Sequence, residues 1–211
     1  MNKKIKKINL KNNPGKLKKN LDRYVKLATE NGATAACIIP TENIVLDERV
    51  RMKCRFPVCE WYATCLNCPP HTGSVDEMRT RVGLYKHAIV FKVEFPDELA
   101  KGQKKQTPQE KQIIYKIISL VESAAFYDGY YFATGFGAGS CRSKMCNNQP
   151  CQALQGLGCR FKARAYASME AVGMDVYRIA TSLGWDIYPI GRSCKEKMVP
   201  YLTRLGLILI A

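Results

Sequence analysis

Histidine and long apolar runs are the two features that this sequence most clearly lacks. His71 and His87 are its only histidines in 211 residues, which excludes a metal centre built mainly from imidazole ligands. No stretch approaches the roughly 20 uninterrupted apolar residues that span a membrane, and the first 20 residues lack the apolar core of a signal peptide. No segment repeats with a period of about 20 to 50 residues, which excludes a repeat array. These absences predict a soluble, cytoplasmic protein.

Acidic residues are also scarce. The chain has 18 of them and 33 lysines and arginines, so its net charge is +15. The first 19 residues hold eight lysines and no acid. We expect residues 1–15 to form a basic arm and residues 16–211 to form a single domain. The arm could bind nucleic acid, but it has no interleaved aromatic residues of the kind that stack on bases, so a solvated tail is favoured.

The hydrophobic pattern predicts helices and strands that alternate along the chain. Helices are expected over residues 16–30, 74–85, 107–128 and 169–183. Strands are expected over residues 35–39, 43–46, 87–95, 130–136, 185–190 and 205–210. Capping-box patterns at Ser74 and Thr107 mark two of the helix starts. The order of elements predicts a mixed α/β or α+β fold, in which helices pack on a mixed sheet and the cysteines lie in irregular loops.

Cysteine is the residue present in excess, with ten copies. Eight of them lie in two blocks separated by 72 residues, a concentration that inert buried cysteines have no reason to show. The first block contains Cys54, Cys59, Cys65 and Cys68, and the second contains Cys141, Cys146, Cys151 and Cys159. Clustered cysteines in a reducing cytoplasm bind metal more often than they form disulfides. We therefore predict that these eight are metal ligands and that Cys37 and Cys194 are structural.

The spacing within the blocks favours an iron–sulfur cluster over zinc. Only Cys65 and Cys68 have the two-residue spacing of a zinc knuckle, and the other gaps are four, five and seven residues long. Single cysteines on loops suit a 4Fe-4S cluster, and a proline after a ligand, as at Cys68-Pro69, also occurs in ferredoxins. Eight thiolates would supply one or two 4Fe-4S clusters, with zinc as the less favoured metal.

A short glycine-rich segment, from Gly135 to Gly139, runs into the second block. It lacks the lysine and hydroxyl residue of a phosphate-binding loop. Two interpretations stay open for Gly137 and Gly139: they let backbone N–H groups approach cluster sulfurs, or they form a simple tight turn.

A few other side chains could take part in chemistry. His71 could donate a proton or ligate iron, although a surface histidine is favoured. Ser168 and Glu170 could place a carboxylate near a cluster, but they also fit an ordinary helix cap, which is favoured. Asp175 could orient Arg178 or the neighbouring loop.

The order and spacing of these motifs resemble one known family, the cysteine-rich predicted metal-binding proteins designated domain of unknown function 2284. The resemblance lies in Lys53-Cys54, Cys59, Tyr62 and Cys68-Pro69-Pro70, in Gly137-Ala138-Gly139-Ser140-Cys141, and in Cys159-Arg160-Phe161 followed by residues 168–176. It covers most of the chain after the arm and implies a cytoplasmic iron–sulfur protein of anaerobic metabolism. The ligands that it implies are Cys54, Cys59, Cys68, Cys141, Cys146, Cys151 and Cys159. Cys65 is not part of the resembled pattern.

Three functions are compatible with these features. The first is an electron-transfer or accessory protein that delivers electrons to a redox partner protein. The second is an enzyme with an open iron that binds a small substrate, for sulfur removal or dehydration. The third is a zinc-stabilised module that binds a polyanion through the lysine arm.

Overall fold

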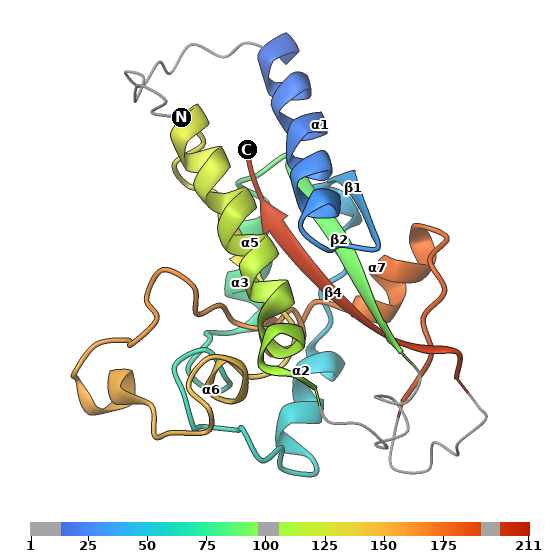
Figure 1. The fold of residues 1–211 in the computed structure, drawn as a ribbon. Helices are drawn as coiled ribbons and strands as arrows, with labels where there is room; N and C mark the ends of the chain where they lie inside the picture. Colours follow the sequence, from blue (N-terminus) through green and yellow to red (C-terminus); the bar gives the residue numbers. More distant parts are fainter. Residues whose placement is uncertain (1–13, 97–105, 191–198) are drawn as a thin grey trace.

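The computed structural model describes residues 14–96, 106–190 and 199–211. Most of the predicted basic arm therefore lies outside the described residues, and so does Cys194. Within the described chain, a four-stranded sheet is covered by helices on both faces (Figure 1). The predicted mixed α/β class is confirmed.

The sheet has the strand order β1-β2-β4-β3. Its strands are β1 (Ala35–Pro40), β2 (His87–Pro96), β3 (Thr134–Phe136) and β4 (Tyr201–Leu209). All three neighbouring pairs are antiparallel, so the sheet is not mixed as predicted. β2 and β3 run in the same direction and are joined by a crossover through α5, but β4 lies between them, so no two neighbouring strands are parallel. β4 lies in the middle of the sheet, between β2 and β3.

Each face of the sheet has its own apolar core. The helices are α1 (Pro14–Glu30) and α5 (Pro108–Asp128) on one face, and α3 (Val75–Val82) and α7 (Val176–Ser182) on the other. In β2, Ile89 belongs to the first core and its neighbour Val90 to the second. Successive side chains of a strand point to opposite faces, which explains why β2 and β4 are apolar along most of their length.

The predicted helix starts are confirmed by their caps. The Ser74 hydroxyl accepts the Glu77 N–H at 3.1 Å, and the Glu77 carboxylate accepts the Ser74 N–H at 2.7 Å. Thr107 forms the same capping box at the start of α5. Gly129 ends α5 with a φ of 105°, a left-handed conformation that glycine adopts without strain.

The strand predicted over residues 43–46 is wrong. Thr41–Asn43 forms a short 3₁₀ helix, η1, and Leu46 pairs only with Met174 in a single bridge. The backbone N–H of Asp47 donates to the Gly173 carbonyl at 2.9 Å. The segment is thus tied to a loop on one side of the molecule, away from the sheet edge.

The helix predicted over residues 169–183 is divided into two pieces. A 3₁₀ helix, η3 (Glu170–Val172), ends at Gly173, whose φ is 87° and which packs against Val75. α7 then begins with Asp175 as its N-cap. The amphipathic pattern was continuous, but the left-handed glycine and the new cap interrupt the helix.

The strand predicted over residues 185–190 is also wrong, because no strand of the described sheet pairs with this segment. The Trp185 N–H donates instead to the Ala180 carbonyl at 3.0 Å, which closes the end of α7. The strand predicted over residues 130–136 is reduced to the three residues of β3.

Two short helices carry cysteines that were predicted to lie in irregular loops. They are α2 (Glu48–Arg55), which contains Cys54, and α6 (Cys141–Lys144), which begins at Cys141. Asp47 and Ser140 are their N-caps. The other cysteines of the two blocks lie in turns and loops, and a 3₁₀ helix, η2 (Gln152–Gln155), follows Cys151.

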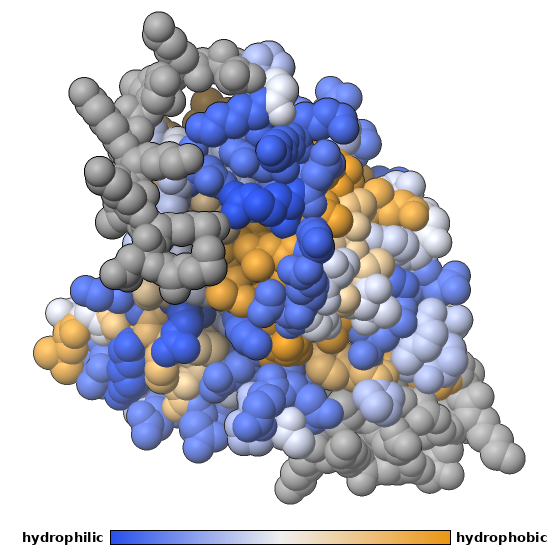
Figure 2. Space-filling view, turned by 45° about the horizontal axis from the view of Figure 1, so that its top comes forward, coloured by the Kyte–Doolittle hydropathy of each residue, from blue (hydrophilic) through white to orange (hydrophobic). Residues whose placement is uncertain are grey.

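Figure 2 shows a face of the molecule that is mainly hydrophilic, with apolar residues gathered near its middle. None of the helices in the described ranges is both long enough and apolar enough to cross a bilayer.

Candidate metal centre

The two cysteine blocks meet beyond the end of β3. The Sγ atoms of Cys65 and Cys141 are 3.7 Å apart, although the residues belong to different blocks. Cys65, Cys68 and Cys141 are buried, with exposed fractions of 1%, 6% and 6%. We call these three residues the inner cysteines. The fold thus brings Cys141 of the second block beside two buried cysteines of the first block.

Two polar side chains hydrogen-bond with the inner sulfurs. The Ser140 hydroxyl lies 3.5 Å from the Cys68 Sγ and 3.8 Å from the Cys65 Sγ, and the Asn67 amide donates to the Cys141 Sγ at 3.4 Å. Both positions follow from local structure, since Ser140 caps α6 and Asn67 lies between two cysteines of the first block. Hydrogen bonds of this kind orient thiolate ligands and tune the metal that they bind.

The inner cysteines share negative charge unequally. Hydrogen bonds from Cys141 and Cys68 hold the pKa of the Cys65 thiol well below its ordinary range. The same contacts with Cys65, followed by burial, raise the pKa values of Cys68 and Cys141. More than one thiolate in this buried place requires a positive charge such as a metal ion.

Cys54 and Cys59 lie beside the inner cysteines on the wall of a cavity, and we call them the wall cysteines. The Cys59 N–H donates to the Cys54 carbonyl at 2.9 Å, and the Trp61 N–H donates to the Cys59 Sγ at 3.5 Å. Burial, and then the charge of Cys59, raise the pKa of Cys54. Cys54 is also near enough to Cys68 to raise the pKa of that thiol electrostatically.

The remaining cysteines of the second block, which we call the outer cysteines, are Cys146, Cys151 and Cys159. Burial raises the pKa of Cys146, while the Arg160 side chain lowers it and the charges of the other two outer cysteines raise it further. Arg142 and Arg160 donate to backbone carbonyls of the same loop, at 2.7 to 3.1 Å. Leu157 in this loop is 71% exposed. Hydrogen bonds from arginines, more than apolar packing, thus hold the outer loop in place.

The cavity beside the wall cysteines has a volume of about 940 Å³. Lys144, Glu170 and Arg204 are among the residues that line it. The Lys144 ammonium and the Arg204 guanidinium each donate to the Gln106 side-chain oxygen at 3.0 Å. Burial, and then the charge of Arg204, lower the pKa of Lys144 to about 8. Burial raises the pKa of Glu170.

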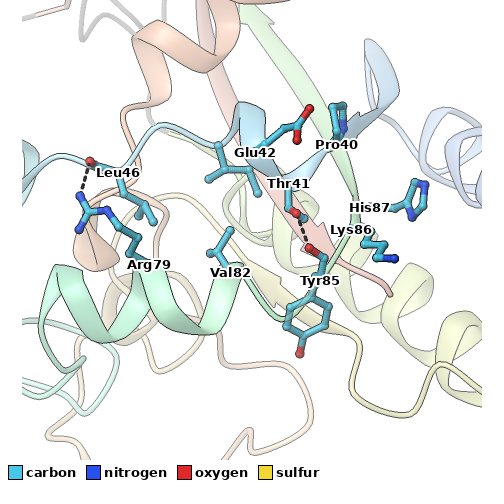
Figure 3. Close-up of a pocket in the computed structure, with 11 residues that line it drawn as sticks. Pro40, Thr41, Glu42, Leu46, Arg79, Val82, Tyr85, Lys86 and His87 are labelled. Atoms are coloured by element: carbon cyan, nitrogen blue, oxygen red, sulfur yellow. Dashed lines mark hydrogen bonds between the residues drawn. The ribbon is translucent and has the colours of Figure 1, made fainter.

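A second cavity, of about 730 Å³, lies at the opposite end of β2 (Figure 3). None of the described cysteines lines it. Thr41 donates to the Tyr85 carbonyl there, and Arg79 donates to the Leu46 carbonyl at 3.1 Å, as the dashed lines show. His87 also lines this cavity, and its Nδ1 atom is buried without a hydrogen-bond partner among the described residues. Because no described cysteine lies there, the cysteine-rich end is the better candidate for a metal centre.

The two glycines before Cys141 differ in conformation. Gly137 forms a parallel bridge with Ser168, and its N–H donates to the Ala167 carbonyl at 2.8 Å, so this N–H points to backbone oxygen. Gly139 has a φ of 74°, and its carbonyl accepts the Tyr115 hydroxyl at 3.0 Å. The turn interpretation suits Gly139 and does not describe Gly137, and a hydrogen bond from this segment to a cluster sulfur stays a prediction.

The other candidates take up capping roles or lie at the surface. The Ser168 hydroxyl accepts the Ala171 N–H at 3.1 Å, and Asp175 accepts the Arg178 N–H at 3.0 Å. Glu170, two residues after Ser168, lines the cavity of the wall cysteines. His71 is exposed.

The cysteine sulfurs of this site are chemically suited to bind a thiophilic metal. None of the nine cysteines in the described chain forms a disulfide, and amide and hydroxyl groups already contact the inner sulfurs. As arranged here, no group of three or more His, Cys, Asp or Glu side chains among the described residues could hold a metal ion. The structure therefore brings cysteines of both blocks together without a coordination geometry.

Sequence reasoning missed several of the polar residues at this end. Asn67 and Ser140 each adjoin a cysteine in sequence, and that adjacency was the available signal. Lys144, Arg204 and Gln106 come from three distant segments, so only the fold shows that they meet.

Comparison with known protein families shows a match over most of the chain. A family model described as "predicted metal-binding protein (DUF2284)" matches residues 37–210. This range runs from β1 to the end of β4 and includes every cysteine of the two blocks. No curated protein and no solved structure matches the chain.

Proposed function

This chain belongs to the family of predicted metal-binding proteins designated domain of unknown function 2284, and from that premise we propose that it is an iron–sulfur protein with a redox role. The inner cysteines would hold a 4Fe-4S cluster, and a redox partner protein would exchange electrons with it. One observation carries the proposal: thiols from both blocks lie together, buried and free of disulfides.

A cluster with four thiolate ligands needs one cysteine besides the inner three. Cys54 is the best candidate, because it is half-buried and interacts electrostatically with Cys68. The outer cysteines would contribute to a second cluster closer to the surface, where a partner protein could approach it.

When bound, a 4Fe-4S cluster supplies one-electron exchange at a potential set by its surroundings. The residues of this chain would set that potential. Asn67 would donate a hydrogen bond to the Cys141 sulfur. The Ser140 hydroxyl accepts from the Cys68 thiol here and would donate to that sulfur once it is a metal-bound thiolate. Such bonds stabilise the more negative state of a cluster. Tyr115 is 1% exposed and belongs to the same core as the inner cysteines, so it would help to exclude water from them.

A single zinc ion is the second candidate, and one distance favours it. Two thiolates on a tetrahedral zinc with bonds of about 2.3 Å lie about 3.8 Å apart. The Cys65 and Cys141 sulfurs are 3.7 Å apart. The number of cysteines and the irregular gaps between them favour iron–sulfur, so zinc remains the alternative against which the proposal is tested.

The test is anaerobic purification followed by iron, acid-labile sulfide and zinc analysis, with electron paramagnetic resonance spectra before and after dithionite. About eight irons and eight sulfides per chain support two clusters, and about four of each support one cluster. In the second case, a cluster that binds small molecules at an open iron would support the enzyme alternative over electron transfer. Zinc without sulfide overturns the iron–sulfur proposal.

A further inference from the structure

The cavity beside the wall cysteines lies along an edge of β4. β3 has only three residues, and they pair with Leu207–Leu209 at the far end of β4. No described strand pairs with Leu202–Leu205 on that side, and these four residues line the cavity. The cavity volume of about 940 Å³ is large enough for a small organic molecule.

Two cations of the cavity have no matching anion among the described residues. Lys144 and Arg204 are both partly buried, and each donates to the same neutral oxygen of Gln106 at 3.0 Å. No carboxylate in the described chain lies within ion-pair distance of either cation. Cations that leave water are usually paired with an anion, because desolvation without a counter-charge is costly.

The acids that line the same cavity are mostly engaged elsewhere. Asp47 pairs with a neighbouring arginine and caps α2, and Asp175 caps α7. Glu60 is exposed. Glu170 attracts Arg204 over a longer distance without forming an ion pair, and so it offsets only part of the positive charge.

The cavity also has polar groups without partners among the described residues and an apolar wall, which suit the polar and apolar parts of an amphipathic ligand. Thr203 is one of the lining residues, and its buried hydroxyl has no hydrogen-bond partner within the described residues. The Gln106 side-chain nitrogen, beside the two cations, is buried and unpartnered in the same way. Tyr177, Ile187 and Leu202 give the cavity an apolar wall.

We propose that this cavity binds a small organic acid, with its carboxylate between Lys144 and Arg204 and its apolar body against Tyr177, Ile187 and Leu202. The carboxylate would accept hydrogen bonds from both cations and supply the missing negative charge. The site adjoins the wall cysteines but needs no metal, so it goes beyond the proposed redox function.

Isothermal titration calorimetry with phenylacetate tests the proposal, with phenylacetamide as the neutral isostere. We expect phenylacetate to bind and phenylacetamide to bind at least tenfold more weakly. Equal affinity for the two compounds, or binding of neither, overturns the proposal. The protein is used as purified, with its metal content measured on the same sample, so a failure of anion binding is distinguished from a failure to bind metal.

Gln106→Glu is the sharpest variant, because it supplies an internal carboxylate to both cations without changing the side-chain shape. We expect it to weaken phenylacetate binding at least tenfold while the far-ultraviolet circular dichroism spectrum stays unchanged. Lys144→Met should weaken binding similarly. Lys116→Met, an exposed change of the same charge on α5, is the control and should leave affinity unchanged. Full affinity in Gln106→Glu, or an equal loss in Lys116→Met, contradicts a specific site.

Discussion

Cys141 and Cys146 belong to the same sequence block, yet the fold supports them in different ways. Cys141 is 6% exposed, begins a helix and contacts Cys65 of the other block. Cys146 lies in a loop whose two leucines are 39% and 71% exposed and whose backbone accepts hydrogen bonds from arginine side chains. Closeness in sequence therefore says little about which cysteines act together.

The core positions the inner cysteines, whereas local hydrogen bonds position the outer cysteines. The inner cysteines belong to the apolar core that α1 and α5 form with the sheet, so folding places them near one another. The outer loop has few buried side chains of its own. We expect a metal at the inner cysteines to depend on the sheet, and a metal at the outer cysteines to stabilise a loop that is otherwise weakly held.

The largest effect is expected from Cys68→Ser, which removes an inner sulfur. A hydroxyl is a poor ligand for a thiophilic metal, so this variant should lose the metal of the inner site and keep that of the outer site. Metal analysis of the purified protein measures the loss. Cys37→Ser, in β1 and outside both blocks, is the matched control and should keep the full metal content. Retention of all metal by Cys68→Ser would remove the inner cysteines from the metal site.

Gly206→Ala should weaken the sheet, on which the inner cysteines depend, and leave the outer loop unchanged. A Cβ atom at Gly206 would lie 2.4 Å from the Cζ of Phe91, in the centre of the core. Overpacking of this kind costs about 1–3 kcal/mol of unfolding free energy. Urea unfolding of the metal-free protein, followed by circular dichroism, measures the cost.

Gly83→Ala is the control for that experiment. Gly83 has a right-handed helical conformation and only ordinary contacts around a Cβ position, so the change should stay within about 0.5 kcal/mol. Equal losses of unfolding free energy in Gly206→Ala and Gly83→Ala would show that the close contact with Phe91 does not destabilise the protein.

Arg160→Met should loosen the outer loop and spare the core. It removes a hydrogen bond to the Pro150 carbonyl, which contributes about 1 kcal/mol and corresponds to about fivefold more frequent opening. Thermolysin cleavage near Leu157 in the metal-free protein reports the opening. Arg164→Met, an exposed neighbour, serves as the control. Unchanged cleavage in Arg160→Met would mean that other contacts hold the loop.

Cys159→Ser should have the smallest effect on folding. Cys159 is exposed, so the metal-free variant should unfold within about 0.5 kcal/mol of the parent protein. The same variant should nevertheless bind less metal if the outer cysteines are ligands. Thermal unfolding with and without metal measures both effects, and a stability loss in the metal-free state would show that the Cys159 side chain supports the fold.

Local signals in the sequence predicted much of the fold. The capping boxes at Ser74 and Thr107 and the apolar run of β2 depend on neighbouring residues, and the structure confirms them. The prediction of one helix over residues 169–183 was wrong, because it followed the continuous hydrophobic period. Gly173 and Asp175 interrupt the helix within that period. The segment 185–190 has the composition of a strand but no partner among the described strands, and pairing is not visible in a single sequence.

The candidate site shows the same division between local and distant information. The residue types and spacing of the cysteines predicted a metal site, and the family match agrees with metal binding. The grouping of Cys141 with the first block could not be predicted, because it depends on how β3 and β4 pair. The meeting of Lys144 with Arg204 is likewise a product of the tertiary fold.

The central position of β4 has a consequence for how the protein matures. β4 is the last described strand in the sequence, and all ten cysteines precede it. During synthesis, the ribosome therefore releases every thiol before the strand that completes both cores can pair with β2. The nascent chain passes through a stage in which its thiols are unshielded, and oxidants or metal donors in the cell compete for them before the sheet closes.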